Sequence, residues 1–596
     1  MKKAAFLMIA GILLAICLPA FAQEFPDVPP DHWAYDAVQD LVEKGIIQGY
    51  PDGTFGGKRA LTRYEFAEAL SKAIPEILEL ARQPAPPPLP GTGEVAPTPP
   101  AAGPQVTKEE FDALRNLVTE FRDELAAVGV DVEALRRDIA ALAERVIVIE
   151  EEIARVKLTG EVNLIGRGTV DNAGAPVDRD SRALGDLNPA EPQNPLANSS
   201  FFTDLQFGMK AKVGEDVSVN ALIAAGNYLK FALDDDELPD LVLWNLYMDG
   251  AVKLGPLGAA QVMVGRFPFQ ITPLTLKFVD PDTYTSVTKL DSGDYVLDGG
   301  SASFNLGKIA LTAFAAKADP ITDLIAPALL LEEEGVPLSQ LAGARLVIGT
   351  GFAGNLGLTY LQAGVGGGRS EIIGADINTN IGSLGVAAEY AESRANLKLQ
   401  KSKGIGGKDD AAWNGKLSYQ MGKLGLGAGY SHVESDYHAP GYWNRLGGIV
   451  NPVNLKGATA NLTYALTPRI SFSAEGQFLK PIDDNLKVAA RTSTSRGRGP
   501  EEKLLLGSKI DKINYWKAGI SYGLTSANTV DLGWEETKLD WTTGAPSGKE
   551  RFISLGVGHS FNPNASLKLL YQIVEYEYGD PSDRGGVATA QFQLKY

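Results

Sequence analysis

Apolar residues recur at alternating steps of three and four between Phe111 and Val156, without a miss over seven heptads. A repeat of 3.5 residues places one apolar stripe along a helix, and the stripe is buried against a partner helix. The pattern therefore predicts an α-helical coiled-coil stalk over residues 107–157. After Phe111, the core a positions are Val118, Leu125, Val132, Ile139, Val146 and Ile153.

β-Branched residues occupy both core positions of this stalk, which shifts coiled coils away from dimers and toward trimers or larger assemblies. We expect a homotrimer whose core is formed by the a positions. Gly129 falls at an e position, outside the apolar stripe, and Asp131 is a good N-cap, so the stalk can divide into two helices. An antiparallel hairpin within one chain is the alternative.

The remainder of the chain, residues 158–596, follows a period of two. In its last segment Ala588, Ala590, Phe592, Leu594 and Tyr596 alternate with polar residues. This alternation is typical of strands with one apolar and one polar face, and it fits a soluble β-sandwich as well as a membrane barrel.

Three features favour an antiparallel transmembrane β-barrel. The chain ends in an aromatic residue, aromatics gather near strand ends, and short connections alternate with long ones. We expect Phe592, Leu594 and Tyr596 to form the terminal signal read by the barrel assembly machinery. The short connections lie near 214–216, 255–256, 307–308, 354–355, 382–383, 422–423, 467–468, 525–526 and 562–563, and the long loops include 171–198, 270–291, 318–340, 397–410, 438–454 and 481–509.

Nine turns imply about 20 strands, with 16 to 20 as the expected range. A barrel of this width leaves a channel unless another segment fills it. Gly425, Gly427 and Gly429 are expected to face inward and either to keep the lumen open or to make room for a plug. Residues Ile321–Glu334 have an apolar helical pattern and are expected either to fold inward as a constriction or to cap the barrel outside.

The first folded segment is expected at residues 23–82. Trp33 begins an apolar helix face, and Gly53 suits a tight turn. Thr62 and Glu65 have the spacing of a capping box that starts a second helix. This succession resembles one S-layer homology (SLH) motif, whose Thr-Arg-Ala-Glu signature reads Thr62-Arg63-Tyr64-Glu65 here.

The resemblance implies that Trp33, Gly53, Thr62, Arg63 and Glu65 take part in cell-wall binding, with Arg63 facing an anionic sugar group. For Trp33 and Arg63 the alternatives are a core aromatic and a solvated surface charge. SLH motifs commonly occur in threes, and only one is present. A homotrimer would supply three.

Taken in order, the parts resemble the SLH-domain outer-membrane porins of the OmpM-like and SlpA-like type. The resemblance implies a trimeric channel in outer-membrane lipid, with its SLH domain and stalk in the periplasm. There it would hold peptidoglycan or an attached secondary polymer. A structural S-layer or adhesin protein with a non-conducting β domain is the alternative.

Other segments of the sequence indicate how the chain is exported and what distance it can span. Residues 1–22 are predicted to be a signal peptide: two lysines, an apolar run and Ala20-Phe21-Ala22. The only cysteine, Cys17, lies within it, so no disulfide is expected. Residues 83–106 are a proline-rich linker that would extend over about 70 Å. The stalk would add about 70 Å if it is continuously helical. Together they could cross a periplasm.

Other chemistry is not expected. Gly519-Ile520-Ser521-Tyr522-Gly523, followed by Asp531 and His559, imitates a hydrolase motif, but the serine lies in a strand rather than at a strand-to-helix turn. The four histidines lie far apart, so no zinc site and no enzyme activity are predicted. Residues 234–237 could hold a surface calcium, although a solvated acidic loop explains them as well.

No nucleic-acid partner is expected, and the formal charge of −18 favours cations only where acidic residues line the lumen.

Overall fold

The chain divides into two compact units, Met1–Ala154 and Arg155–Tyr596, in a computed structural model. In the first unit the structure describes residues 61–82 and 118–127, with scattered residues between 26 and 59 and between 116 and 141. In the second it describes residues 155–171, 177–180, 182, 184, 198–214, 216–233, 238–255, 258–318, 338–350, 354–365, 368–396, 409–488, 509–542, 547–577 and 583–596.

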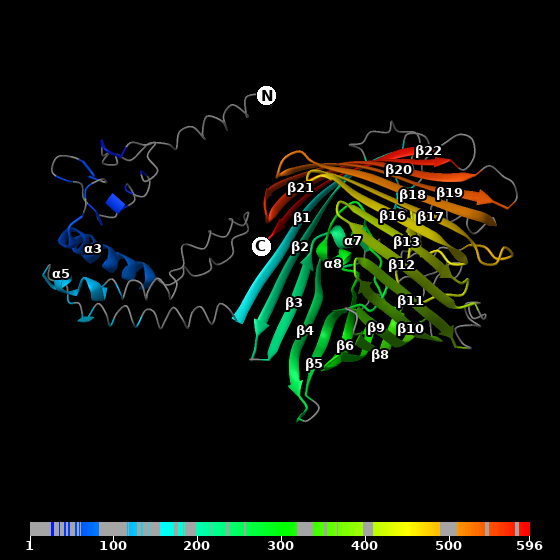
Figure 1. The fold of residues 1–596 in the computed structure, drawn as a ribbon, viewed down its shortest axis with the longest axis horizontal. Coiled ribbons are helices and arrows are strands. Elements are labelled where there is room, and N and C mark those ends of the chain that lie inside the picture. Colours follow the sequence, from blue (N-terminus) through cyan, green and yellow to red (C-terminus); the bar gives the residue numbers. More distant parts are fainter. Residues whose placement is uncertain are drawn as a thin grey trace. The chain divides into compact units, whose positions relative to one another are not determined.

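The second unit is a 20-stranded antiparallel barrel (Figure 1). Each strand pairs with the next along the chain, and β1 pairs with β22, which closes the sheet. The first half consists of β1 (Val156–Asp171), β2 (Ser199–Lys212), β3 (Val217–Ala225), β4 (Leu241–Lys253), β5 (Ala259–Phe269), β6 (Tyr295–Leu306), β7 (Ile309–Ala318), β8 (Leu338–Thr350), β9 (Gly354–Val365) and β10 (Gly368–Ile381).

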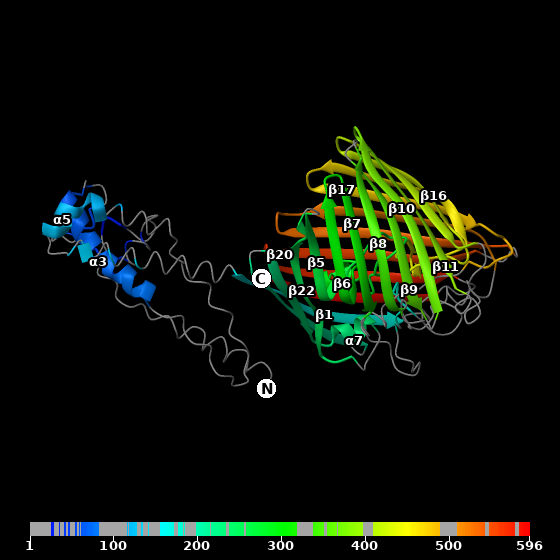
Figure 2. The same ribbon diagram turned by 90° about the horizontal axis from the view of Figure 1, so that it is seen from below.

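The second half completes the circle, and the strands lie side by side around the wall (Figure 2). It consists of β11 (Leu384–Ala395), β12 (Ala411–Met421), β13 (Leu424–Val433), β16 (Leu455–Thr467), β17 (Ile470–Pro481), β18 (Ile510–Gly523), β19 (Asn528–Trp541), β20 (Gly548–Asn562), β21 (Ala565–Glu577) and β22 (Asp583–Lys595). A separate two-stranded ribbon is formed by β14 (Arg445–Leu446) and β15 (Ile449–Val450).

All nine expected short connections join consecutive strands, and they lie at one end of the barrel, where β1 begins and β22 ends. We call this the turn side and the opposite end the loop side. The strand number lies at the upper limit of the expected range. The first strand begins at Val156, two residues before the predicted boundary. The predicted alternation of short and long connections fails at one place on the loop side, because β9 and β10 are joined by residues 366–367 alone.

Alternation along the strands separates two faces, as predicted. On β22 the side chain of Gln591 is 3% exposed inside the barrel, whereas Leu594 is 37% exposed outside. On β13 Leu426 and Tyr430 face outward, while Gly425 and Gly427 face inward against polar side chains. An apolar outer surface on a closed barrel requires a bilayer, which excludes the soluble sandwich.

Exposed aromatics form two girdles on the outer face. On β12 and β18 the two levels are six residues apart, or about 20 Å along a strand, on the scale of an outer-membrane apolar band. Charge pairs such as Arg394 with Glu392 continue the outer face beyond the loop-side girdle. That girdle contains Tyr360, Tyr390, Trp413, Tyr430, Phe478, Trp516, Trp534 and Tyr571, and the turn-side girdle contains Tyr419, Tyr464, Tyr522, Phe561 and Tyr596.

Tyr576 does not belong to a girdle, although its place near a strand end suggested it. Its side chain is 1% exposed inside the barrel, and its hydroxyl donates to the carbonyl oxygen of Asp178 at 3.3 Å. The phase of the alternation, rather than closeness to a strand end, decides on which face an aromatic residue lies.

The first unit contains α3 (Arg63–Arg82) and α5 (Arg122–Ala127). The predicted capping box is confirmed: Glu65 N donates to Thr62 Oγ1 at 3.2 Å, and Thr62 N donates to Glu65 Oε2 at 2.8 Å. Ala134 N donates to Asp131 Oδ1 at 2.9 Å, the expected helix cap after Gly129. Among the described residues, no helix is long and apolar enough to cross a membrane.

Candidate functional site in the barrel lumen

Three connections on the loop side fold into the lumen, and their described residues are 177–180, 182 and 184, then 270–294, and then 434–454. We call them the plug. The helix α7 (Tyr228–Leu233) packs against them, and α8 (Thr288–Asp291) lies within the second segment. Figure 1 shows both helices within the ring of strands. Inward-facing residues at this level are buried on strands around the whole circumference, among them Phe267, Leu361, Ile372, Ile513, Phe552 and Val587.

The segment 270–294 is fastened to the wall where β1, β2 and β22 meet. Thr288 Oγ1 donates to Glu161 Oε2 at 2.5 Å, and Lys289 Nζ forms a buried ion pair with Asp204. Gln591 closes the contact in both directions, since its amide donates to Ser286 O at 2.7 Å and accepts from Ser286 N at 2.9 Å. Wall and plug therefore share one buried polar network, and such networks fix a unique packing when they are fully paired.

Asp180 joins the three segments. Its carboxylate accepts from Thr283 N and Thr283 Oγ1, each at 2.9 Å, and from Arg445 Nη2 at 2.5 Å, while Arg182 lies 3.5 Å away. Burial opposes the charged form, but the guanidinium groups of Arg445 and Arg182 outweigh it and lower the pKa of Asp180. The carboxylate is therefore charged throughout the physiological range and binds the plug together.

The segment 434–454 contacts both its neighbour in the plug and the distant wall. Tyr437 Oη donates to Leu274 O, and Lys277 N donates to Pro440 O at 3.0 Å. On the wall, Gly448 N donates to Glu550 Oε2 at 3.2 Å. Through these hydrogen bonds the plug connects the segment that follows β5 with Glu550 on β20.

The sequence pointed to a different segment. Residues 321–334 were one candidate for an inward fold, but they lie outside the described part of the chain. Three of the expected long loops, 171–198, 270–291 and 438–454, contribute to the plug instead, and the second of them lies in the segment 270–294. Its alternation of Leu274, Leu276 and Phe278 with polar residues was the available signal, and all three side chains are at most 3% exposed.

The turn-side half of the lumen is a polar vestibule. Ser418, Gln420, Thr463 and Ser473 face it and are exposed. Its charged residues are of both signs, including Lys416, Lys517 and Lys568 with Glu475 and Asp531. The described lumen is therefore not predominantly acidic, although the whole chain carries a formal charge of −18.

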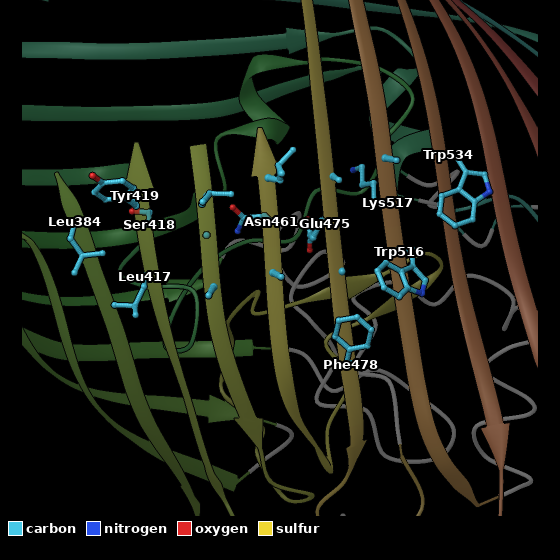
Figure 3. Close-up of a pocket in the computed structure, with 18 residues that line it drawn as sticks. Leu384, Leu417, Ser418, Tyr419, Asn461, Glu475, Phe478, Trp516, Lys517 and Trp534 are labelled. Carbon is cyan, nitrogen blue, oxygen red and sulfur yellow. The ribbon is translucent and has the colours of Figure 1, made fainter. Parts of the chain in front are cut away.

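The outer face of the same wall carries an apolar groove of about 600 Å³. Figure 3 shows the strands that form it, with Phe478, Trp516 and Trp534 on three adjacent strands. Outward-facing small residues, among them Ala428, Ala460 and Ala474, leave room between these large side chains. The groove lies at the level of the apolar band, so it faces hydrocarbon.

The hydrolase-like motif does not assemble a catalytic site. Ser521 and Asp531 are directly opposite each other on β18 and β19, inside the barrel. His559 lies near the outward-facing ring of Phe561, 4.4 Å between ring centroids, and its Nδ1 is 2.8 Å from Asn528 Oδ1. No group of three potential metal ligands occurs within the described ranges, and the acidic run 234–237 lies outside them.

In the SLH segment, Arg63 lies against Glu120 and Phe121, which belong to the predicted stalk. Its Nη2 donates to Glu120 O at 3.1 Å, its guanidinium lies 4.7 Å from the Phe121 ring centroid, and its side chain remains 54% exposed. Thr62 and Glu65 are brought together with it. Trp33 and Gly53 lie outside the described residues.

Of the predicted trimer core, the structure describes only the first part. Val118 is fully buried within one chain, and Phe121 of the next core position contacts Phe66 of α3 with ring centroids 4.8 Å apart. Leu125 lies within α5. Val132, Ile139, Val146 and Ile153 lie outside the described residues.

The last residues lie at the barrel seam. Tyr596 N donates to Gly160 O at 3.0 Å, and Gly160 N donates to Tyr596 O at 2.9 Å. The ring of Phe592 lies 5.9 Å from that of Phe561 on the outer face. Phe592, Leu594 and Tyr596 therefore lie on the outer, lipid-facing side of the last strand.

Comparison with known proteins gives two family matches. Residues 24–67 match the S-layer homology domain, and residues 340–481 match the Gram-negative porin family. The resemblance to SLH-domain outer-membrane porins is confirmed. The matches assign the barrel to the outer membrane and the SLH domain to the periplasm.

Curated relatives are similar over part of their length. The chain is 39% identical to "Outer membrane protein SlpA" of Thermus thermophilus over 157 residues, which cover 26% of this chain and 15% of that protein. It is 33% identical to "Outer membrane protein alpha" of Thermotoga maritima over 177 residues, covering 28% of this chain and 40% of that one. The match therefore spans less than half of each relative.

Among solved structures, OccK11 (OpdR) of Pseudomonas aeruginosa aligns at 10% identity and a TM-score of 0.42. The alignment covers 74% of this chain and 97% of that one. This likeness is too distant to support an argument.

Proposed function

We propose that the chain forms an outer-membrane porin that passes small hydrophilic solutes or ions and ties the outer membrane to peptidoglycan or its attached polymer. The observation that carries the first part is a closed 20-stranded wall with an apolar outside and a polar vestibule. Barrels of 16 or more strands are wide enough for an aqueous channel. The enzyme alternative lacks a site within the described residues.

The plug sets the size of the passage. It reaches the wall on all sides, so solutes that cross would pass between its three segments or between plug and wall. Charged residues of both signs line the vestibule, which argues for weak charge selectivity rather than the cation preference that the total charge of −18 would suggest.

The tether depends on the SLH segment, the linker over residues 83–106 and the stalk over residues 107–157. An exposed Arg63 beside a capped helix suits an anionic group of a wall polymer, because a guanidinium binds such groups through paired hydrogen bonds. The linker and the stalk together supply about 140 Å of reach if fully extended and helical.

A homotrimer would bring three SLH segments together. Val118 is already buried within one chain, so the proposed contact between chains is better assigned to the later a positions, Val132, Ile139, Val146 and Ile153. The alternative, a hairpin within one chain, would leave a single SLH segment on each molecule.

A second candidate function follows from the plug itself. Its bonds to β1, β2, β20 and β22 would suit a non-conducting barrel that serves only as a membrane anchor for a surface or wall layer. In that case the SLH segment, rather than the lumen, would be the functional part.

Single-channel recording of purified full chain in planar bilayers separates the two candidates. Discrete conductance steps, in groups of three for a trimer, are the expected result. If folded, heat-modifiable protein inserts and remains silent across the voltage range, the porin function is refuted and the anchor function stands.

A further inference from the structure

A cavity of about 220 Å³ lies where the plug meets the wall of β12, β13, β16 and β17. Trp443 and Asn444 line it from the plug, and Lys416, Asn461 and Glu475 line it from the wall. Lys416 and Asn461 are exposed, so the cavity opens onto the vestibule. In Figure 3 Asn461 and Glu475 lie on adjacent strands, where they are directly opposite each other.

The plug side of this cavity is fixed in place. Trp443 Nε1 donates to Pro452 O at 3.1 Å, and its backbone N–H donates to Asn451 Oδ1 at 3.0 Å. Asn444 Nδ2 donates to Gln477 Oε1 at 2.9 Å, and Gln477 Nε2 donates back to Asn444 Oδ1 at 3.2 Å. A ligand would therefore meet a preformed surface, which lowers the entropic cost of binding.

The wall side offers two charged side chains, Lys416 and Glu475, that form no ion pair with a described residue. Lys416 is directly opposite Ala387 on one neighbouring strand and Gly429 on the other, and it forms no ion pair with any described residue. Glu475 accepts a hydrogen bond from Gln477 Nε2 at 2.9 Å. Lys517 is directly opposite Glu475 on β18, yet no ion pair joins them in the described wall.

The two charges are separated along the wall. From β12 to β17 the wall takes three strand-to-strand steps through β13 and β16, about 14 Å between backbones at a spacing of ~4.8 Å. Lys416 and Glu475 form no ion pair with each other across the described wall. Asn461 lies between them and makes no hydrogen bond to another described side chain.

We propose that this cavity is a binding site for a small zwitterion of dipeptide size. The carboxylate of the ligand would bind Lys416, its ammonium group would bind Glu475, and Asn461 would hydrogen-bond the amide between them. This inference rests on the proposed porin function, because it names the class of solute that the lumen retains on its way through.

The test is binding of glycylglycine to detergent-solubilised full chain, measured by isothermal titration calorimetry. Lys416→Gln and Glu475→Gln should each weaken binding about tenfold, because each removes one charge-assisted contact. Lys568→Gln and Asp531→Asn make the same charge changes elsewhere in the lumen and should alter the dissociation constant less than twofold. N-acetylglycine and glycinamide, which each lack one of the two charges, should bind about tenfold more weakly than glycylglycine.

The outcomes are decisive. Absence of glycylglycine binding, or equal weakening by pocket and control substitutions, overturns the proposal. Preferential binding of N-acetylglycine would show an anion site at Lys416 instead. Calorimetry does not require a conducting channel, so a silent barrel that binds glycylglycine refutes the porin function alone. A conducting barrel without binding refutes this site alone.

Discussion

Arg63 combines an exposed guanidinium with contacts to Glu120 and Phe121. Arg63→Ala in the full chain should weaken sedimentation with purified sacculi by at least about tenfold, because a charge-assisted contact to an anionic sugar group would be lost. The measurement is the fraction of protein that pellets with sacculi as their amount is varied.

Two variants separate wall binding from an effect on the fold. Glu120→Gln removes the intramolecular ion pair and keeps Arg63, so its pelleting should equal that of the wild type. Arg122→Ala removes an exposed arginine that pairs with Glu133 at 3.8 Å, and it should also leave pelleting unchanged. Normal pelleting of Arg63→Ala would remove Arg63 from the site.

Gly160 lies beneath the ring of Tyr596 at the seam between β1 and β22, where an added Cβ would collide with the ring. Gly160→Ala should displace Tyr596 and lower the temperature at which the folded band disappears on gels, by a few degrees. Gly166→Ala, on the same strand, meets no atom within 4 Å and is the matched control. Equal melting of the two variants would show that the ring contributes nothing.

Residue-level predictions from sequence succeeded where the interaction is local. Thr62 and Glu65 are three positions apart on one helix turn, so their spacing alone identified the capping box. Arg63 contacts Glu120, which is 57 positions away, and no spacing rule indicates such a pair. Lys416 and Glu475 could be assigned to the inner face by alternation, but the cavity beside them depends on where the plug packs.

At the scale of elements, the plug depends on Arg445. Its guanidinium is 9% exposed and pairs with Asp180, which is 2% exposed. Arg445→Ala leaves a buried carboxylate without this partner and should cost about 3 kcal/mol, since breaking a buried pair is strongly destabilising. We expect the plug to loosen, which would appear as larger or noisier conductance steps and faster cleavage of residues 270–294 by added protease.

Arg469→Ala is the control, because Arg469 lies in the exposed turn between β16 and β17. It should leave conductance and protease resistance as in the wild type. Unchanged steps in Arg445→Ala would mean that the passage does not run along the plug.

Asp280 gives the plug a pH dependence. Burial, with the nearby carboxylates of Asp180 and Asp291, raises its pKa from 3.8 to about 7, against the opposing effect of a hydrogen bond from Asp282 N and of Arg445. The folded protein thus holds this proton more tightly than the unfolded chain. The resulting stabilisation is complete below about pH 4 and is lost as the pH rises to about 7.

Asp280→Asn removes this dependence. On semi-native gels its melting temperature at pH 7.5 should exceed that of the wild type by roughly 2–4 °C, while the difference at pH 4.5 should be smaller. Asp511→Asn, an exposed carboxylate on β18, should behave as the wild type at both pH values. A constant difference between Asp280→Asn and wild type at both pH values would contradict the assignment.

Strands and turns were predictable because each is encoded by residues that are close together in the sequence. A period of two marks the strands, and Gly, Pro and Asn mark turns such as those at Gly382 and Gly422, whose φ angles are +64° and +56°. The inward path of residues 270–294 was not predictable, because it is decided by partners such as Asp204 and Gln591 on strands far away in the sequence.

At the scale of the molecule, the proposed homotrimer would depend on the later heptads of the predicted stalk. Ile139→Asp places a charge in the proposed trimer core and should convert the assembly to monomers, since burying an unpaired carboxylate costs several kcal/mol. Light scattering on detergent-solubilised protein would then give one chain mass instead of three. Arg137→Asp, at an exposed position, is the control and should remain trimeric. A wild-type mass of one chain would favour the hairpin.

The heptad stalk stays a prediction. The barrel fold class followed from the sequence, because alternation is a local pattern that repeats along the chain. The distribution of charge in the lumen did not follow from the sequence. The formal charge of −18 is a sum over the whole chain, whereas the vestibule depends on which residues point inward at that level.

β1 follows the stalk in the chain and is hydrogen-bonded along both edges, from Val156 to Gly168 with β2 and from Glu161 to Asp171 with β22. A force transmitted from the cell wall would therefore act along two hydrogen-bonded ladders in shear, and many hydrogen bonds would share that force at once. Non-covalent binding of the SLH segment to a sugar polymer has no such pair of hydrogen-bonded ladders to share the force. If the proposed tether binds the cell wall, mechanical stress on the envelope should first break the contact between the SLH segment and the cell-wall polymer. The barrel would keep its seam, and the SLH segment could bind the polymer again.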